Sequence, residues 1–250
     1  MNCILLPAAN FLHDTAHINA LPQIDHVNNV LAAKVGDTLK IGQLGGHLGT
    51  AVIDDMTSDR IQLRDVQLSI APPAKLDLTV ILALPRPKVL RRLIMDMTAL
   101  GVRDIILINS YRTQKSYWQS PMLKRLDEFV LEGLQQGVDT IAPRISLQKR
   151  FKPFVEDELP RLVSKGAIVA HPYTSQSLTQ YLKKQYLQKQ DLQKPPALAM
   201  PNLVCIGAEG GWIDYEIELL AAQGCEAVHV GLRILRTEAA VNVLLGQWLL

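Results

Sequence analysis

Two patterns of hydrophobic and polar residues divide the chain near residues 71–74. Before this point, short segments alternate between apolar and polar positions, as strands with one exposed face do. Residues 38–41 and 60–68 show this alternation, and residues 50–54 are expected as the return strand of a hairpin. After it, nearly continuous apolar runs, typical of strands buried on both faces, alternate with segments of helical spacing. The consecutive prolines at positions 72 and 73 favour extended backbone and make this segment the predicted linker.

The first region, residues 1–71, is predicted to form a small β-barrel, because its strands are short and closely spaced. One short helix is expected at residues 25–33. Residues 42–49 contain four glycines between two predicted strands. We interpret them as a hairpin turn that needs positive φ angles rather than as a phosphate-binding loop, since no helical pattern follows.

The second region, residues 74–250, is predicted to be an α/β domain with a mostly parallel sheet, because its strands and helices alternate. The expected strands are residues 76–84, 104–108, 167–170, 203–206 and 227–230. The expected helices are residues 87–100, 121–136, 214–223 and 237–250, of which three end at a glycine that suits a helix C-terminus. Ligands bind beyond the carboxyl ends of such strands.

Three of these strand ends carry candidate binding residues. Residues 206–211 contain three glycines, which allow close approach of the backbone and expose amide N–H groups. Residues 230–240 contain one glycine and two arginines ahead of a helix whose N-cap is expected at Thr237. His171 follows a third strand. The alternatives are an ordinary strand-to-helix turn, arginines paired with nearby carboxylates, and a structural histidine.

Composition and motifs exclude several classes of protein. Three cysteines without a CxxC pair argue against a disulfide framework and a cysteine-rich zinc site, so a reducing, cytoplasmic setting is expected. We expect no signal peptide, no membrane span and no metal. The dinucleotide GxGxxG, the phosphate-binding GxxxxGK[ST], and the HExxH and GxSxG motifs are absent.

Positive charge is concentrated in one part of a nearly neutral chain. Residues 74–152 carry 14 Lys and Arg against seven acidic residues, whereas residues 1–73 carry four basic and seven acidic ones. Such a segment suits a polyanionic partner, although solvated helix faces give the same surplus.

The two C-terminal loops together resemble the IGPEGG and LGxRILRTETA signatures of the RsmE family, SPOUT-class methyltransferases that act on 16S rRNA. The resemblance covers most of the chain. It includes residues 25–37 in the first region, residues 84–88 and 100–102 in the second, Arg112, and His171-Pro172.

The resemblance implies a PUA-like β-barrel that binds RNA, followed by a SPOUT α/β domain with a C-terminal trefoil knot. It further implies a homodimer that methylates N3 of one uridine of 16S rRNA in the small ribosomal subunit, with S-adenosyl-L-methionine bound in the knot. The implied cofactor contacts are His171, Ile206, Gly207, Ala208, Glu209, Gly210, Gly211, Val230, Gly231, Ile234, Leu235, Thr237 and Ala239.

Uracil N3–H is a weak acid, so its methylation needs a base or a group that stabilises the anion. The catalytic candidates are Arg236 and Arg233, to stabilise uracil oxygens or position a phosphate, and Glu209 and Glu238, as acid or base or as partners that orient an arginine. The candidate RNA-binding residues are Arg86, Lys88, Arg91, Arg92, Arg112 and Lys115.

The chain departs from the family pattern in its helices more than in its loops. Asp96, Ala99 and Asp139 stand where lysine, glutamate and arginine are usual. These departures motivate two alternatives: an RNA-binding SPOUT protein that no longer transfers methyl groups, and a methyltransferase that acts on another RNA nucleotide.

Overall fold

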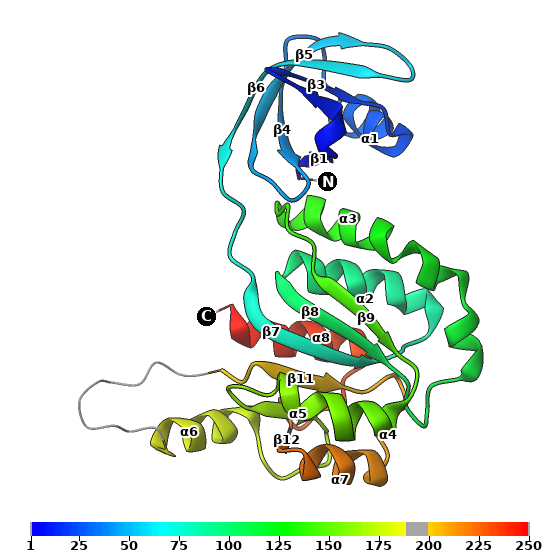
Figure 1. Ribbon diagram of the computed structural model, residues 1–250, viewed down its shortest axis with the longest axis vertical. Coiled ribbons are helices and arrows are strands. Elements are labelled where there is room, and N and C mark those ends of the chain that lie inside the picture. Colours follow the sequence, from blue (N-terminus) through cyan, green and yellow to red (C-terminus); the bar gives the residue numbers. More distant parts are fainter. Residues whose placement is uncertain (1, 189–199, 250) are drawn as a thin grey trace. The chain divides into compact units, whose positions relative to one another are not determined.

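The computed structural model describes residues 2–188 and 200–249, and the chain divides into two compact units (Figure 1). The first unit is Met1–Ala74 with Asp127–Ala142, and the second is Lys75–Leu126 with Pro143–Leu250. The sequence predicts a division into residues 1–71 and 74–250, whereas in the structure residues 127–142 group with the first unit. Helical periodicity shows that a helix has an apolar face, but not which sheet that face covers.

The first unit is built on a six-stranded sheet in the order β1-β4-β5-β6-β3-β2. Every pair is antiparallel except β1 with β4. The predicted hairpin is confirmed by β4 and β5, with Gly45 at φ +76° in its turn. The expected helix at residues 25–33 begins earlier, as α1 (Leu21–Asp25), and continues through Val30. The strands are β1 (Ile4–Leu6), β2 (Phe11–Leu12), β3 (Thr15–Ile18), β4 (Thr38–Gln43), β5 (Leu48–Met56) and β6 (Ile61–Ile70).

Helix α3 (Leu126–Gly137) is tied to this unit by buried glutamines. The side-chain nitrogen of Gln23 donates to Gln135 Oε1 over 2.9 Å and also lies 2.9 Å from the carbonyl of Leu5. Buried amides need such partners, so the pair fixes the position of the helix. Val138, rather than Gly137, takes the left-handed conformation after the helix, with φ 54°.

The second unit contains a six-stranded parallel sheet in the order β12-β10-β11-β7-β8-β9, which confirms the predicted α/β class. The edge strand β9 is not evident from the sequence, and the last strand lies two residues before its expected position. The strands are β7 (Leu76–Ala83), β8 (Val102–Ile108), β9 (Arg144–Gln148), β10 (Ala167–Ala170), β11 (Leu203–Ile206) and β12 (Cys225–Val228).

Helices cover both faces of this sheet (Figure 1). On one face, Phe154, Leu159 and Leu220 pack with strand residues such as Ile81 and Val169. On the other, α2 packs against α8. The helices are α2 (Pro87–Ala99), α4 (Phe151–Pro153), α5 (Leu159–Leu162), α6 (Leu178–Gln188), α7 (Asp214–Ala222) and α8 (Thr237–Leu245). Among the described residues, we find no helix with the length and hydropathy needed to span a bilayer.

Candidate cofactor and substrate site

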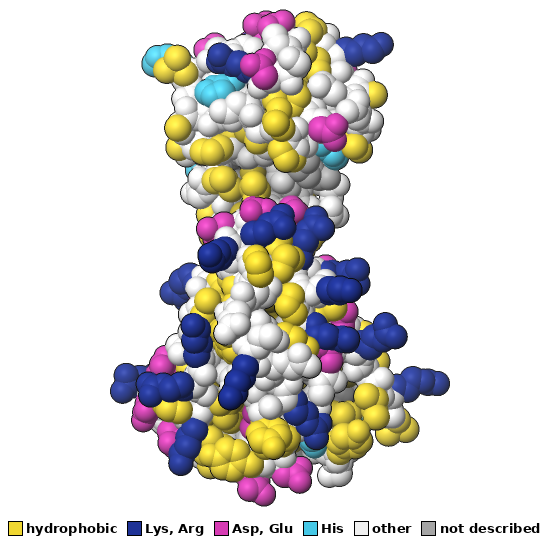
Figure 2. Space-filling view, turned by 90° about the vertical axis from the view of Figure 1, so that its right-hand side faces the viewer, with side chains coloured by type: hydrophobic (Ala, Val, Ile, Leu, Met, Phe, Trp, Pro, Cys, Tyr) yellow, Lys and Arg dark blue, Asp and Glu magenta, His cyan; other side chains and the backbone are white. Residues whose placement is uncertain are grey.

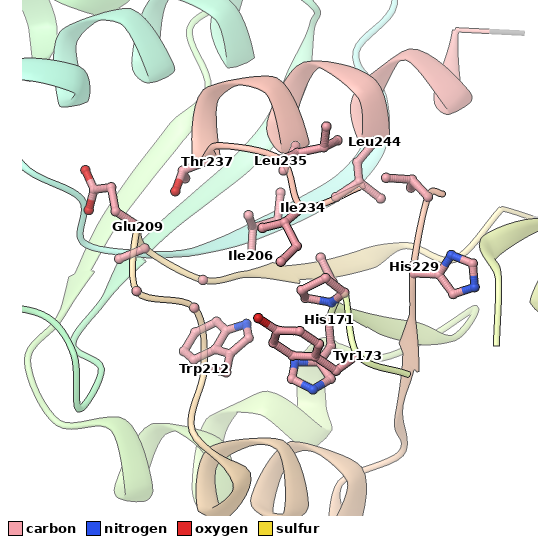
Figure 3. Close-up of a pocket in the computed structure, with 18 of the residues that line it drawn as sticks. His171, Tyr173, Ile206, Glu209, Trp212, His229, Ile234, Leu235, Thr237 and Leu244 are labelled. Carbon is pink, nitrogen blue, oxygen red and sulfur yellow. The ribbon is translucent and has the colours of Figure 1, made fainter. Parts of the chain in front are cut away.

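A cavity of about 200 Å³ opens at the carboxyl ends of β10, β11 and β12, the edge where ligands bind in parallel sheets (Figure 3). Its walls come from residues 170–173, 206–212, 228–231 and 233–235, from Arg112 and from one face of α8. In Figure 3, His171, Tyr173 and Trp212 face a group of apolar side chains that includes Ile206, Ile234, Leu235 and Leu244. All of these residues belong to the second unit.

Residues 207–211, here called the β11 loop, form a tight turn that needs glycine. The amide of Gly211 donates to the carbonyl of Ala208 over 2.8 Å, and Gly211 has φ +69°. A Cβ atom on Gly207 would lie 2.9 Å from the Cα of Gly211. The backbone therefore folds back on itself at a distance that no side chain allows.

Residues 229–236, here called the β12 loop, lead into α8. Gly231 has φ +145°, and its amide donates to Nδ1 of His229 over 3.1 Å. The expectation that Thr237 caps α8 is wrong. Arg236 is the N-cap, with extended backbone and no side-chain capping bond, and the buried Thr237 is the first helical residue.

His171 closes the cavity on the side of β10. Its amide donates to the carbonyl of Val228 over 3.0 Å, and its ring meets that of Tyr173 edge-on at 5.6 Å. Burial lowers the pKa of His171 below its usual value, against a smaller raising effect from Asp214. The imidazole is therefore neutral near pH 7.

The structure brings most of the expected cofactor residues together but not Ala239. Thr237, Ala240 and Leu244 place one face of α8 on the cavity, because residues three and four apart share a helix face. Ala239 lies on another face and is exposed. The expected residues that line the cavity are His171, Ile206, Gly207, Ala208, Glu209, Gly210, Gly211, Val230, Gly231, Ile234, Leu235 and Thr237.

The four catalytic candidates differ in position. Arg233 and Glu209 line the cavity, whereas Arg236 and Glu238 do not. Arg236 is exposed and Glu238 is half-buried in the first turn of α8. The Glu209 carboxylate already has a partner, because its Oε1 accepts from Nε of Arg86 at 3.1 Å and from the amide of Arg86 at 3.0 Å.

Two residues expected to bind RNA contact the β11 loop in the structure. Arg86 holds Glu209, and the guanidinium of Arg112 donates to the carbonyl of Gly210 and lines the cavity. Charge alone could not show this, since a basic residue that binds a neighbouring loop looks the same in a sequence. The other basic candidates, Lys88, Arg91, Arg92 and Lys115, are exposed.

Sequence reasoning missed several residues of the cavity wall. Tyr173, Trp212 and Leu244 lie there, and apolar residues at such positions are indistinguishable from core residues in a sequence. The one sequence signal for any of them was the tryptophan at position 212, directly after the glycines. Its indole Nε1 is buried and has no hydrogen-bond partner among the described residues.

The chain belongs to the RNA methyltransferase domain family, whose profile matches residues 72–249. Two relatives share the name Ribosomal RNA small subunit methyltransferase E, which confirms the resemblance inferred from the loops. The Treponema pallidum protein is 27% identical over 96% of this chain and 87% of its own length. The Synechocystis protein is 28% identical over 90% of this chain and 70% of its own length.

Solved structures share the fold over nearly the whole chain. A Legionella pneumophila protein assigned as a methyltransferase, in complex with the bound cofactor SAM, gives a TM-score of 0.71 at 19% identity over 99% of this chain and 96% of that one. Ribosomal RNA small subunit methyltransferase E from Neisseria gonorrhoeae, bound to S-adenosyl methionine, gives 0.68 at 20% identity with the same coverage of both chains.

Proposed function

We propose that this protein methylates N3 of one uridine of 16S rRNA within the small ribosomal subunit, with S-adenosyl-L-methionine as the methyl donor. The cavity formed by the β11 and β12 loops, in a chain of the RNA methyltransferase domain family, carries the proposal. The names of the relatives support the rRNA substrate, and two structures of the same fold hold this donor.

The cavity fits the donor chemically. The glycines of the β11 loop leave backbone amides approachable, and Ile206, Leu235 and Leu244 supply apolar walls for an adenosine. Nε1 of Trp212, which has no partner in the part of the chain that the structure describes, is a buried donor that a polar ligand atom would satisfy. A neutral His171 does not repel a cationic sulfonium. When bound, the donor supplies an electrophilic methyl group.

The reaction forms an N3–C bond, breaks the donor's S–C bond and releases the N3 proton, so charge must be stabilised on the uracil. Arg233 and Arg112 are the arginines that line the cavity, and Arg236 follows Arg233 by three residues, at the start of α8. Arg233 and Arg236 are proposed to stabilise uracil oxygens or a phosphate. The contact with Arg86 supports an orienting role for Glu209, which leaves Glu238 as the candidate base.

The charge of the two units supports RNA binding by the second. That unit contains 22 Lys and Arg against 13 Asp and Glu, whereas the first contains four against 11. Lys and Arg side chains gather over the second unit in Figure 2. Phosphate contacts dominate the affinity of such complexes. The basic residues Lys88, Arg91 and Arg92 on α2 are proposed to contact the RNA backbone.

We also propose that the fold is of the SPOUT class, with a trefoil knot at the C-terminus and a PUA-like barrel in the first unit. The sheet order supports the knot, because β11 is inserted between β7 and β10 and β12 returns to the far side of β10. A homodimer is proposed because the C-terminal segment exposes large apolar side chains. Leu232 is 99% exposed, Ile234 69% and Val243 43%.

Methyl transfer to small ribosomal subunits that lack the modification tests the proposal. Labelled donor should place its methyl group on N3 of a single uridine, located by nuclease digestion and mass spectrometry. Arg236→Ala should abolish transfer while cofactor affinity stays within about tenfold, or about 1.4 kcal/mol. Donor binding without any transfer by the wild-type protein would favour an RNA-binding role, and a product on another nucleotide would favour another RNA target.

A further inference from the structure

Tyr111 is an exposed aromatic residue on a firmly held loop. Its side chain is 79% exposed, although the loop follows the buried strand β8. The amide of Tyr111 donates to Oε1 of Glu216 over 2.7 Å, and the other carboxylate oxygen accepts from Ile213 at 3.0 Å. Glu216 is only 2% exposed. The backbone that carries the ring is thus fixed to the segment that follows the β11 loop.

The residue after Tyr111 joins this loop to the cavity. Arg112 lines the cavity, and its guanidinium donates to the carbonyl of Gly210. Its aliphatic part also packs on the β11 loop, since a Cβ atom on Gly210 would lie 2.8 Å from Cδ of Arg112. Tyr111 therefore stands one residue outside the wall of the cavity, and these contacts limit the movement of its backbone.

The side chain of Thr113 also anchors this loop. Its hydroxyl lies 2.9 Å from Oγ of Ser110 and 3.2 Å from the carbonyl oxygen of Leu84. These contacts leave little backbone entropy to lose when a ligand binds. An exposed aromatic ring on a pre-ordered backbone is suited to stacking, and basic residues on the same unit favour an anionic strand.

We propose that Tyr111 is a stacking platform for a nucleobase next to the nucleotide that enters the cavity. This inference rests on the proposed function, because a base must leave its helical stack to reach a methyl donor, and its neighbours then lose a stacking partner. An aromatic ring at the rim replaces that partner. The platform tolerates any base, since every base presents a π face.

The test compares two fluorescein-labelled single strands of equal length: oligouridine and an abasic strand with the same phosphates. Fluorescence anisotropy gives the affinity of the full-length protein for each. Tyr111→Ala should bind oligouridine about tenfold more weakly, or about 1.4 kcal/mol, and the abasic strand equally well. Tyr111→Phe, which keeps the ring, should bind like the wild type. Tyr215→Ala, on α7 and 49% exposed, is the matched control.

Three results would overturn the inference: equal affinity of the wild type for the two strands, an equal loss on both strands in Tyr111→Ala, or a loss in Tyr111→Phe as large as in Tyr111→Ala. The proposed function is tested separately by methyl transfer to small ribosomal subunits. A wild type that transfers nothing refutes the function while the strand comparison still decides the role of Tyr111. In an active enzyme, Tyr111→Ala should raise KM for the subunit about tenfold and leave donor affinity unchanged.

Discussion

A single methyl group at Gly207 should damage the cavity. In Gly207→Ala, the new Cβ would lie 2.9 Å from the Cα of Gly211, 3.1 Å from its carbonyl carbon and 3.2 Å from the amide nitrogen of Trp212. These atoms belong to the backbone, so no rotation of a side chain relieves the contacts. The turn that closes the β11 loop must therefore move.

Overpacking of this kind costs about 1–3 kcal/mol. The displaced backbone is the part of the loop whose amides are proposed to face the cofactor. We therefore expect donor affinity to fall by about 2 kcal/mol, which is roughly 30-fold. Calorimetric titration with S-adenosyl-L-methionine measures this change, and circular dichroism with thermal unfolding shows whether the variant folds.

Gly246→Ala is the matched control. Gly246 ends α8 with φ −56°, and a Cβ atom there would have no heavy atom within 4 Å. It should bind the donor like the wild type. If Gly207→Ala also binds within about twofold of the wild type, or about 0.4 kcal/mol, the β11 loop is not the cofactor site and the reasoning is refuted.

Two further predictions concern pH and stability. Because burial lowers the pKa of His171, the free protein holds this ring neutral above its usual pKa of about 6.5. Donor affinity should be constant above that pH and fall as the pH drops through the lowered pKa, where an imidazolium would repel the sulfonium. Folding stability should fall as the pH drops from the usual pKa to the lowered one, since in that range the unfolded chain takes up the proton and the folded chain does not. His171→Gln should remove both effects, and a wild-type affinity that stays constant down to the pH at which the protein unfolds would contradict the first. Val138→Gly should raise the free energy of unfolding by about 0.5–1 kcal/mol, because a left-handed conformation costs a β-branched residue about 1–2 kcal/mol and glycine gives part of this back as entropy. Urea denaturation measures this, and a less stable variant would show that lost packing of Val138 outweighs the strain.

Local patterns were enough to predict the elements that frame the site. The apolar runs at β7 and β11 and the glycines after β11 are properties of adjacent residues, so they can be read without knowing the fold. Strand β9 could not be predicted because it is an edge strand with mostly exposed, polar residues. The association of α3 with the first unit rests on a bond between Gln23 and Gln135, which are 112 residues apart. No local pattern encodes such a pairing.

The structure around positions 96 and 139 weakens the argument for lost catalysis. Asp96 accepts a hydrogen bond of 3.0 Å from the side chain of Asn242, which joins α2 to the helix that follows the β12 loop. Asp139 is 2% exposed, and its carboxylate accepts from the amide of Ile141 at 2.9 Å. Both aspartates therefore have local structural roles here. Lysine at position 96 could not accept the bond from Asn242. The contact between α2 and α8 therefore explains the acidic residue at this position. A mapped product on another nucleotide would consequently direct attention to the exposed basic residues of α2 rather than to Asp96 or Asp139.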